Sequence, residues 1–224
     1  MPVKLIEGQK LYHGSNVVVI APDLSYSRAE VDFGPGFYCT VFEQQARKWA
    51  KGKTVSSLND SHYVVSEYTL GNIETLDVLE FTEPDISWFK AVIRGRKGFP
   101  ANADIVIGPV ADSSIREILV DTEERISSLQ KHLYDYPSLS EYREAERDIY
   151  RQAAASAVPP QFRNDNQTVF VTEKGLQHIT FCRAFVYDSS GCRTGVYDRN
   201  GRYYPYSRTE GRTLPKGDDD VRRH

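Results

Sequence analysis

Short apolar runs separated by polar turns dominate the chain and predict a set of β-strands. Residues 62–70 alternate apolar and polar side chains, which is the period of a strand with one buried face. Residues 104–110 form a nearly continuous apolar run that Gly108 and Pro109 end, as expected for a buried strand. The same criteria predict strands or extended segments over residues 10–14, 16–24, 73–81, 167–172 and 182–188.

Two other stretches have the period of an amphipathic helix. Over residues 41–52 apolar side chains, Trp49 among them, recur at helical spacing, and Gly52 is expected to end the helix. A second helix is expected to begin after Pro84 and to carry Trp88 on its apolar face. Because large aromatic side chains on an apolar helix face are usually buried, we expect both tryptophans in the core.

The chain changes character twice in its second half. Residues 112–156 are charged and rich in alanine, and Pro137 divides them into two predicted helices. We therefore expect a helical insertion at about residues 112–160 within a domain that spans residues 1–188. Beyond it, residues 189–224 are rich in Gly, Arg, Asp and Tyr without apolar periodicity, which indicates a flexible tail or a small hairpin.

These elements indicate an α+β fold, because strands and helices do not alternate as they do in a doubly wound sheet. The 224 residues are 40% hydrophobic, enough for a core without disulfide bonds. Three cysteines without metal-ligand spacing indicate reduced thiols and no metal site. The chain has no signal-peptide pattern and no run of eighteen apolar residues, so we expect a cytoplasmic protein without membrane contact. A net charge of −3 does not indicate nucleic-acid binding by the chain as a whole.

The pair His13–Gly14 in "LYHGS" is the first candidate for ligand chemistry. A glycine lets another molecule approach the main chain, and an imidazole can bond to a hydroxyl group. The alternative is a histidine at the end of a strand beside a turn glycine, and the pair alone favours this alternative.

The stretch "DFGPGFYCT", residues 32–40, is the second candidate. Its glycines and proline predict a constrained turn, beyond which Tyr38 can present a flat ring for stacking. For Phe33 and Phe37 we favour burial in the core, and Cys39 is expected to pack as a small hydrophobic residue.

Taken with "QQARKWA", these motifs resemble the ADP-ribosyltransferase superfamily, in the clade with histidine and tyrosine at the first two site positions. Within that clade the chain is most similar to a bacterial family of uncharacterised domains of the DUF3990 type. The resemblance covers roughly residues 9–112 and 164–182, and it implies a split β core that binds NAD in a cleft. It also implies that NAD is a substrate and that no metal takes part.

The resemblance assigns roles to individual residues. His13 would hold a ribose hydroxyl of NAD, and the main chain of Gly14 would pair with the nicotinamide carboxamide. Ser15 would help to hold the ligand, and Tyr38 would stack on the nicotinamide ring. Arg28, in the loop before the second motif, is a candidate contact for the diphosphate.

The third site position of such enzymes is often a glutamate at the start of a late strand, and here the matching residue is Gln167 in "NQTVF". A glutamine can bond to the ribose but is a poor base. Glu173 is an alternative carboxylate, but strand alternation puts it beyond the strand end. We therefore expect His13, Tyr38 and Gln167 to be the catalytic residues.

The resemblance implies an NAD-dependent mono-ADP-ribosyltransferase, possible roles being a toxin of a toxin–antitoxin pair or a phage-defence effector. The acceptor would be a protein or a nucleic acid, and a cognate antitoxin would be a further partner. Two alternatives stay open: an NAD hydrolase, and a non-catalytic module of the same fold that binds NAD, ADP-ribose or a protein. Arg94 and Arg96 are expected to stabilise a helix end rather than to contact the diphosphate.

Overall fold

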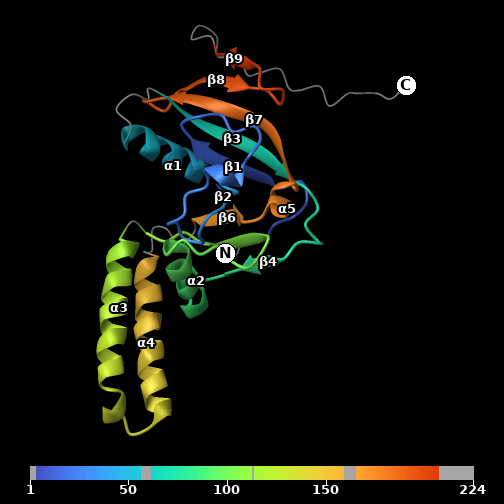
Figure 1. The fold of residues 1–224 in the computed structure, drawn as a ribbon. Helices are drawn as coiled ribbons and strands as arrows, with labels where there is room; N and C mark the ends of the chain where they lie inside the picture. Colours follow the sequence, from blue (N-terminus) through green and yellow to red (C-terminus); the bar gives the residue numbers. More distant parts are fainter. Residues whose placement is uncertain (1–3, 57–61, 113, 159–164, 207–224) are drawn as a thin grey trace.

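The computed structural model describes residues 4–56, 62–112, 114–158 and 165–206, and it confirms an α+β fold, built on two β-sheets (Figure 1). The first sheet is antiparallel, with the strand order β1–β3–β7–β8–β9. Its strands are β1 (Lys10–Ser15), β3 (His62–Leu70), β7 (Ile179–Asp188), β8 (Arg193–Tyr197) and β9 (Tyr203–Pro205).

The second sheet has the order β2–β6–β5–β4. Its strands are β2 (Phe37–Cys39), β6 (Asn166–Phe170), β5 (Ile105–Pro109) and β4 (Val78–Glu80). Only β4 and β5 run parallel among these pairs. The expected strand over residues 73–81 is thus limited to β4, which is exposed at the sheet edge.

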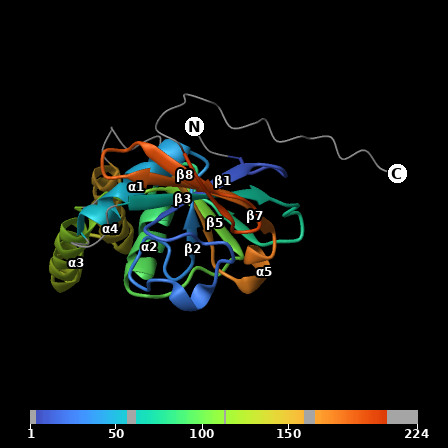
Figure 2. The ribbon, with the colours of Figure 1, turned by 90° about the horizontal axis from the view of Figure 1, so that it is seen from above.

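One apolar core fills the space between the two sheets, which lie across each other (Figure 2). Leu11 and Val64 of the first sheet contribute to it, as do Ile105 and Phe170 of the second. Cys39 is buried in the same cluster, as predicted. Tyr12 and Thr40 join the sheets: each main-chain N–H donates to the other residue's carbonyl oxygen, at 2.7 and 3.0 Å.

Helix α1 (Glu43–Ser56) packs on the opposite face of the first sheet. Ala46 and Ala50 contribute to a second cluster there, with Tyr63 of β3 and Tyr187 of β7. The expected end of this helix at Gly52 is wrong. A glycine inside a helix costs about 1 kcal/mol relative to alanine but does not stop it.

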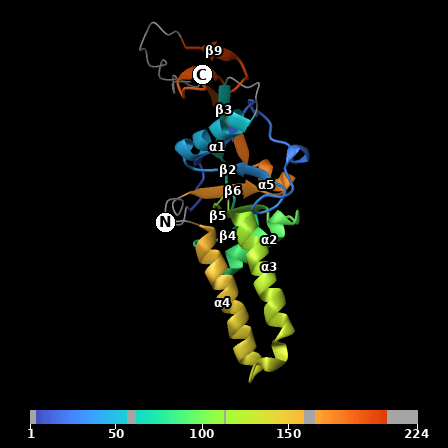
Figure 3. The same cartoon turned by 90° about the vertical axis from the view of Figure 1, so that its left-hand side faces the viewer.

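Three further helices lie beyond the second sheet: α2 (Ile86–Arg96), α3 (Ile115–Lys131) and α4 (Leu139–Ala157). Trp88 of α2 is fully buried, as predicted. The hairpin of α3 and α4, joined through the 3₁₀ turn η2 (Leu133–Asp135), projects away from the sheets (Figure 3). Its base packs on α2, and the residues expected at the end of the insertion, 159–160, lie outside the described residues.

The apolar segment 16–24 is not a strand, which corrects the prediction. It leads into a 3₁₀ turn, η1 (Leu24–Tyr26). Side chains of β3 satisfy its main chain in place of a neighbouring strand: the N–H of Val19 donates to Ser66 Oγ, and its carbonyl accepts from Tyr68 Oη. The segment therefore forms a wall over the sheet instead of extending it.

Beyond β6, the short helix α5 (Glu173–Leu176) precedes β7. β8 and β9 then form a hairpin that continues the first sheet to Pro205. Arg193 anchors the hairpin, because its guanidinium lies 3.8 Å from the centre of the Phe185 ring and 3.0 Å from Glu43 Oε1.

Residues 207–224 of the expected tail lie outside the described residues. Within the described part, no helix has the length and apolarity needed to cross a membrane.

Candidate functional site

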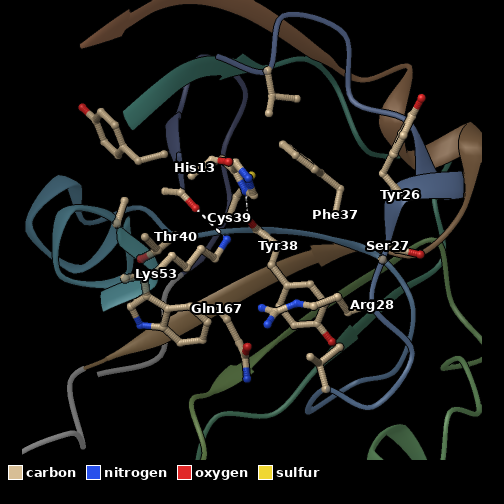
Figure 4. Close-up of a pocket in the computed structure, with 18 of the residues that line it drawn as sticks. His13, Tyr26, Ser27, Arg28, Phe37, Tyr38, Cys39, Thr40, Lys53 and Gln167 are labelled. Atoms are coloured by element: carbon tan, nitrogen blue, oxygen red, sulfur yellow. Dashed lines mark hydrogen bonds between the residues drawn. The ribbon is translucent and has the colours of Figure 1, made fainter. Parts of the chain in front are cut away.

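A cavity of about 910 Å³ opens where β1 and β2 part after the Tyr12–Thr40 pair (Figure 4). Its volume is near the upper end of the range for small-molecule sites, about 300–1,000 Å³. Its walls come from β1, β2, α1, Gln167 of β6, and the segment that leads through η1. The six residues that the sequence assigned to the site all line this cavity: His13, Gly14, Ser15, Arg28, Tyr38 and Gln167.

His13 is held by the second motif. Its Nδ1 lies 2.7 Å from the carbonyl oxygen of Tyr38, and its ring stacks on Phe37 with the centroids 4.5 Å apart. Because a carbonyl only accepts, Nδ1 carries the proton and Nε2 of the neutral ring is an acceptor. Burial lowers the pKa of His13 to about 4, so the ring is neutral at pH 7. Nε2 can therefore accept a hydrogen bond from a ligand hydroxyl.

Gly14 faces the cavity with its main chain. Tyr12 directs its N–H and C=O to Thr40 and not to β3, and by the alternation of an antiparallel strand Gly14 directs its own groups to the same side. Among the described residues no strand pairs with β1 on this side beyond Tyr12, and the Gly14 carbonyl accepts from Lys53 Nζ at 3.0 Å. This edge of β1 offers the donor–acceptor pair that an amide requires.

The missing side chain of Gly14 also allows a close contact within the fold. A Cβ at this position would lie 2.2 Å from the carbonyl oxygen of Ala46, so the glycine lets α1 pack against β1. Ser15, the next residue, is buried and bonds locally, accepting from the N–H of Val17 at 3.4 Å.

Tyr38 presents its ring because its hydroxyl is already used. The hydroxyl donates to the carbonyl of Gly34 at 2.8 Å and accepts from the N–H of Phe33 at 3.0 Å. Burial raises the pKa of Tyr38, so it stays protonated. With both functions of the hydroxyl bound to its own turn, Tyr38 can contact a ligand by stacking and not by proton transfer.

The helix α1 contributes two residues that the sequence analysis did not identify. Trp49 lines the cavity and is 40% exposed, so its predicted burial is wrong. Lys53, one turn further, also lines the cavity. Burial first, and then the charge of Arg28, lower the pKa of Lys53. The sequence could have indicated these residues through their spacing, because positions 46, 49 and 53 lie on one side of the helix.

Gln167 is buried at the cavity wall, with its side chain anchored at the nitrogen. Nε2 donates to Asp32 Oδ2 at 2.8 Å and to the carbonyl of Pro109 at 3.2 Å. Oε1 is buried and has no hydrogen-bond partner in the described part of the chain. Glu173 is exposed at the start of α5 and does not line the cavity. Of the two candidates for the third position, only Gln167 lies at the site.

The buried Asp32 and the partly exposed Arg96 form an ion pair at the same wall. Both Nε and Nη2 of Arg96 donate to Asp32 Oδ1. Arg96 was expected to stabilise the end of its helix, and it also has Asp32 as a specific partner. Neither Asp32 nor this pairing was recognised in the sequence, because 64 residues separate the partners. The described residues contain no group of three His, Cys, Asp or Glu side chains placed to hold a metal ion.

No curated protein and no solved structure matches the chain. A protein family described as "protein of unknown function (DUF3990)" matches residues 9–181, a span that contains every cavity residue named above. The chain belongs to the DUF3990 family.

Proposed function

We propose that this protein is an ADP-ribosyltransferase of the histidine–tyrosine clade that binds NAD in the cavity at the edge of β1. The observation that carries the proposal is the edge of β1 at Gly14, which lines the cavity beside His13 and Tyr38 and whose carbonyl accepts from Lys53. An amide, a ring and a hydroxyl are three groups of one nicotinamide riboside. The cavity offers a partner for each of them.

The fit extends to the rest of the cavity wall. Trp49 provides a second aromatic surface, and the unpartnered Oε1 of Gln167 provides a hydroxyl acceptor. Arg28 is exposed at the cavity wall, where its charge suits a diphosphate. These features support NAD rather than a ligand without phosphate.

The proposed reaction breaks the bond between the nicotinamide nitrogen and C1′ of the ribose. NAD supplies this activated bond, and the electron pair leaves with nicotinamide, which departs neutral and needs no acid. In the proposed complex, Gly14 and Tyr38 hold the nicotinamide ring, and His13 and Gln167 hold the ribose. The acceptor then bonds to C1′ and loses its proton to solvent or to its own base.

The third position limits what this site can do. Gln167 cannot remove a proton, and the neighbouring Asp32 is engaged by Arg96. An acceptor that is already nucleophilic is therefore favoured, in a protein or a nucleic acid of the cytoplasm. A toxin or phage-defence effector with a cognate antitoxin is the biological setting that we propose.

A non-catalytic NAD-binding module is the second candidate, and the glutamine at position 167 is the observation that favours it. An NAD hydrolase is the enzymatic alternative, with water as the acceptor. Incubation of the purified protein with adenine-labelled NAD and cell lysate separates the three. Label in protein or nucleic acid supports the transferase, and free ADP-ribose alone supports hydrolysis. Binding without turnover supports the module, and no binding overturns all three.

A further inference from the structure

The orientation of the Gln167 side chain follows from its neighbours. Asp32 Oδ2 and the carbonyl of Pro109 both only accept hydrogen bonds, and both face the same end of the amide. That end must be the NH₂ group, so Oε1 points the other way. Another buried glutamine at the cavity, Gln45, has partners at both ends: Nε2 donates to the carbonyl of Asn166, and Oε1 accepts from Thr40. Within the part of the chain that the structure describes, Gln167 has hydrogen-bond partners only at its nitrogen.

Asp32 is itself fixed from several sides. Arg96 donates to Oδ1, and the N–H of Ala111 donates to Oδ2 at 3.0 Å. The turn that carries Asp32 is pressed against α2: a Cβ at Gly95 would lie 2.3 Å from the Asp32 carbonyl oxygen and 2.5 Å from the Gly34 nitrogen. The carboxylate thus has one position, and the Gln167 nitrogen must meet it there.

We propose that Asp32 is a positioning residue that holds the Gln167 amide in one orientation, with Oε1 as a hydroxyl-accepting atom at the cavity wall. The inference rests on the proposed NAD site, where the hydroxyl belongs to the ribose on the nicotinamide side. Oε1 is buried and has no hydrogen-bond partner among the described residues, and this hydroxyl would supply one.

The pair also explains why the third position is a glutamine. A glutamate there would place a second acceptor against Asp32 and the carbonyl of Pro109. Gln167 and Asp32 are therefore a matched pair, in which the amide binds the substrate hydroxyl and the carboxylate sets its direction. Asp32 acts through Gln167 and does not itself contact the reacting atoms.

Nuclear magnetic resonance tests the orientation without any ligand. In the full chain, the side-chain NH₂ signals of Gln167, assigned by their loss in Gln167→Met, should exchange slowly with solvent. In Asp32→Asn, the NH₂ group of the new side chain must face either Arg96 or the donors that now bond to Oδ2. The Gln167 NH₂ signals should therefore shift, and their exchange with solvent should be at least about tenfold faster. The NH₂ of Gln45 should stay unchanged and is the control for folding. Rapid exchange of the Gln167 NH₂ in the wild type, or no change in Asp32→Asn, overturns the inference.

Calorimetric titration then tests the acceptor role with NAD and with analogues that lack the 2′- or the 3′-hydroxyl of the nicotinamide-side ribose. The wild type should bind one analogue about tenfold more weakly than NAD, the loss expected when a buried acceptor stays unpaired. Asp32→Asn should lose this discrimination, whereas Asp148→Asn, at an exposed position of α4 away from the cavity, should keep it. Equal wild-type affinity for NAD and both analogues overturns the acceptor role. Absence of NAD binding with a protected Gln167 NH₂ overturns the proposed function and leaves the amide orientation standing.

Discussion

His13 Nδ1 lies 2.7 Å from the carbonyl oxygen of Tyr38, a hydrogen bond that joins the two sequence motifs across 25 residues. The bond fixes the neutral tautomer, and burial lowers the pKa of His13 to about 4. A histidine in the unfolded chain has a pKa near 6.5, so unfolding takes up a proton between the two values. The stabilising effect of neutral His13 is complete above about pH 6.5 and is lost as the pH falls through about 4.

This linkage predicts a steeper acid destabilisation than that of a variant without the titrating ring. His13→Asn keeps a donor near the Tyr38 carbonyl but does not titrate. Between pH 7 and pH 4, the free energy of unfolding of the wild type should fall further than that of the variant, by at most about 3 kcal/mol. Urea denaturation at a series of pH values measures this, and His132→Asn, at an exposed histidine, is the control. Parallel curves for wild type and His13→Asn would contradict the assigned tautomer and burial.

Lys53 occupies the acceptor that the proposed carboxamide would use. Its Nζ donates to the Gly14 carbonyl at 3.0 Å. Lys53→Met should remove this competing donor and tighten the binding of free nicotinamide by about fivefold, the equivalent of one hydrogen bond of about 1 kcal/mol. Calorimetric titration of nicotinamide measures the change, with Lys51→Met, an exposed position on the same helix, as the control. Weaker binding by Lys53→Met would mean that the lysine assists the ligand.

Two glycines of the region should respond oppositely to the same substitution. Gly14→Ala places a methyl group 2.2 Å from the Ala46 carbonyl oxygen, which forces α1 away from β1 and should cost about 1–3 kcal/mol. Gly52→Ala meets nothing within 4 Å in an exposed part of α1 and should stabilise by up to about 1 kcal/mol. Thermal and urea unfolding of both variants measure the signs. Equal tolerance of both substitutions would contradict the close packing of α1 on β1.

Gln167→Glu should not restore a missing catalytic group. The new carboxylate would face Asp32 and the Pro109 carbonyl, so the variant should lose about 1–3 kcal/mol of stability at pH 8. The loss should shrink as the pH is lowered toward 5, because a protonated glutamate can donate to Asp32 as the amide does. Urea unfolding at both pH values measures this, beside Glu173→Gln at the exposed start of α5. A stable and more active Gln167→Glu would contradict the pairing with Asp32.

The sequence predicted those features that depend on local patterns. The alternation over residues 62–70 gave β3, and the helix after Pro84 begins as expected, with Asp85 as its N-cap and Trp88 buried. The predicted strand over residues 16–24 is wrong, because an apolar run of this length resembles a strand in the sequence. What prevents strand pairing there is two side chains of β3, Ser66 and Tyr68, which take the main-chain hydrogen bonds.

The site shows the same division. His13, Gly14, Tyr38 and Gln167 were identified through motifs, and the cavity brings them together. The contact of Asp32 with Gln167 spans 135 residues, and no local pattern could indicate it. Trp49 was assigned to the core because helical spacing identifies an apolar side of a helix but not what that side faces. In α1 the alanines face the sheet and Trp49 faces the cavity.

Calorimetric titration of the purified protein with NAD is the most direct test of the central claim, that the cavity at the edge of β1 binds this dinucleotide. We expect saturable binding at submillimolar NAD, competition by nicotinamide, and a loss of affinity of at least about tenfold in Tyr38→Leu, where the stacking ring is removed. Tyr134→Leu, at an exposed tyrosine of η2 outside the cavity, should bind as the wild type does. No saturation at millimolar NAD, or equal binding by Tyr38→Leu, would contradict it.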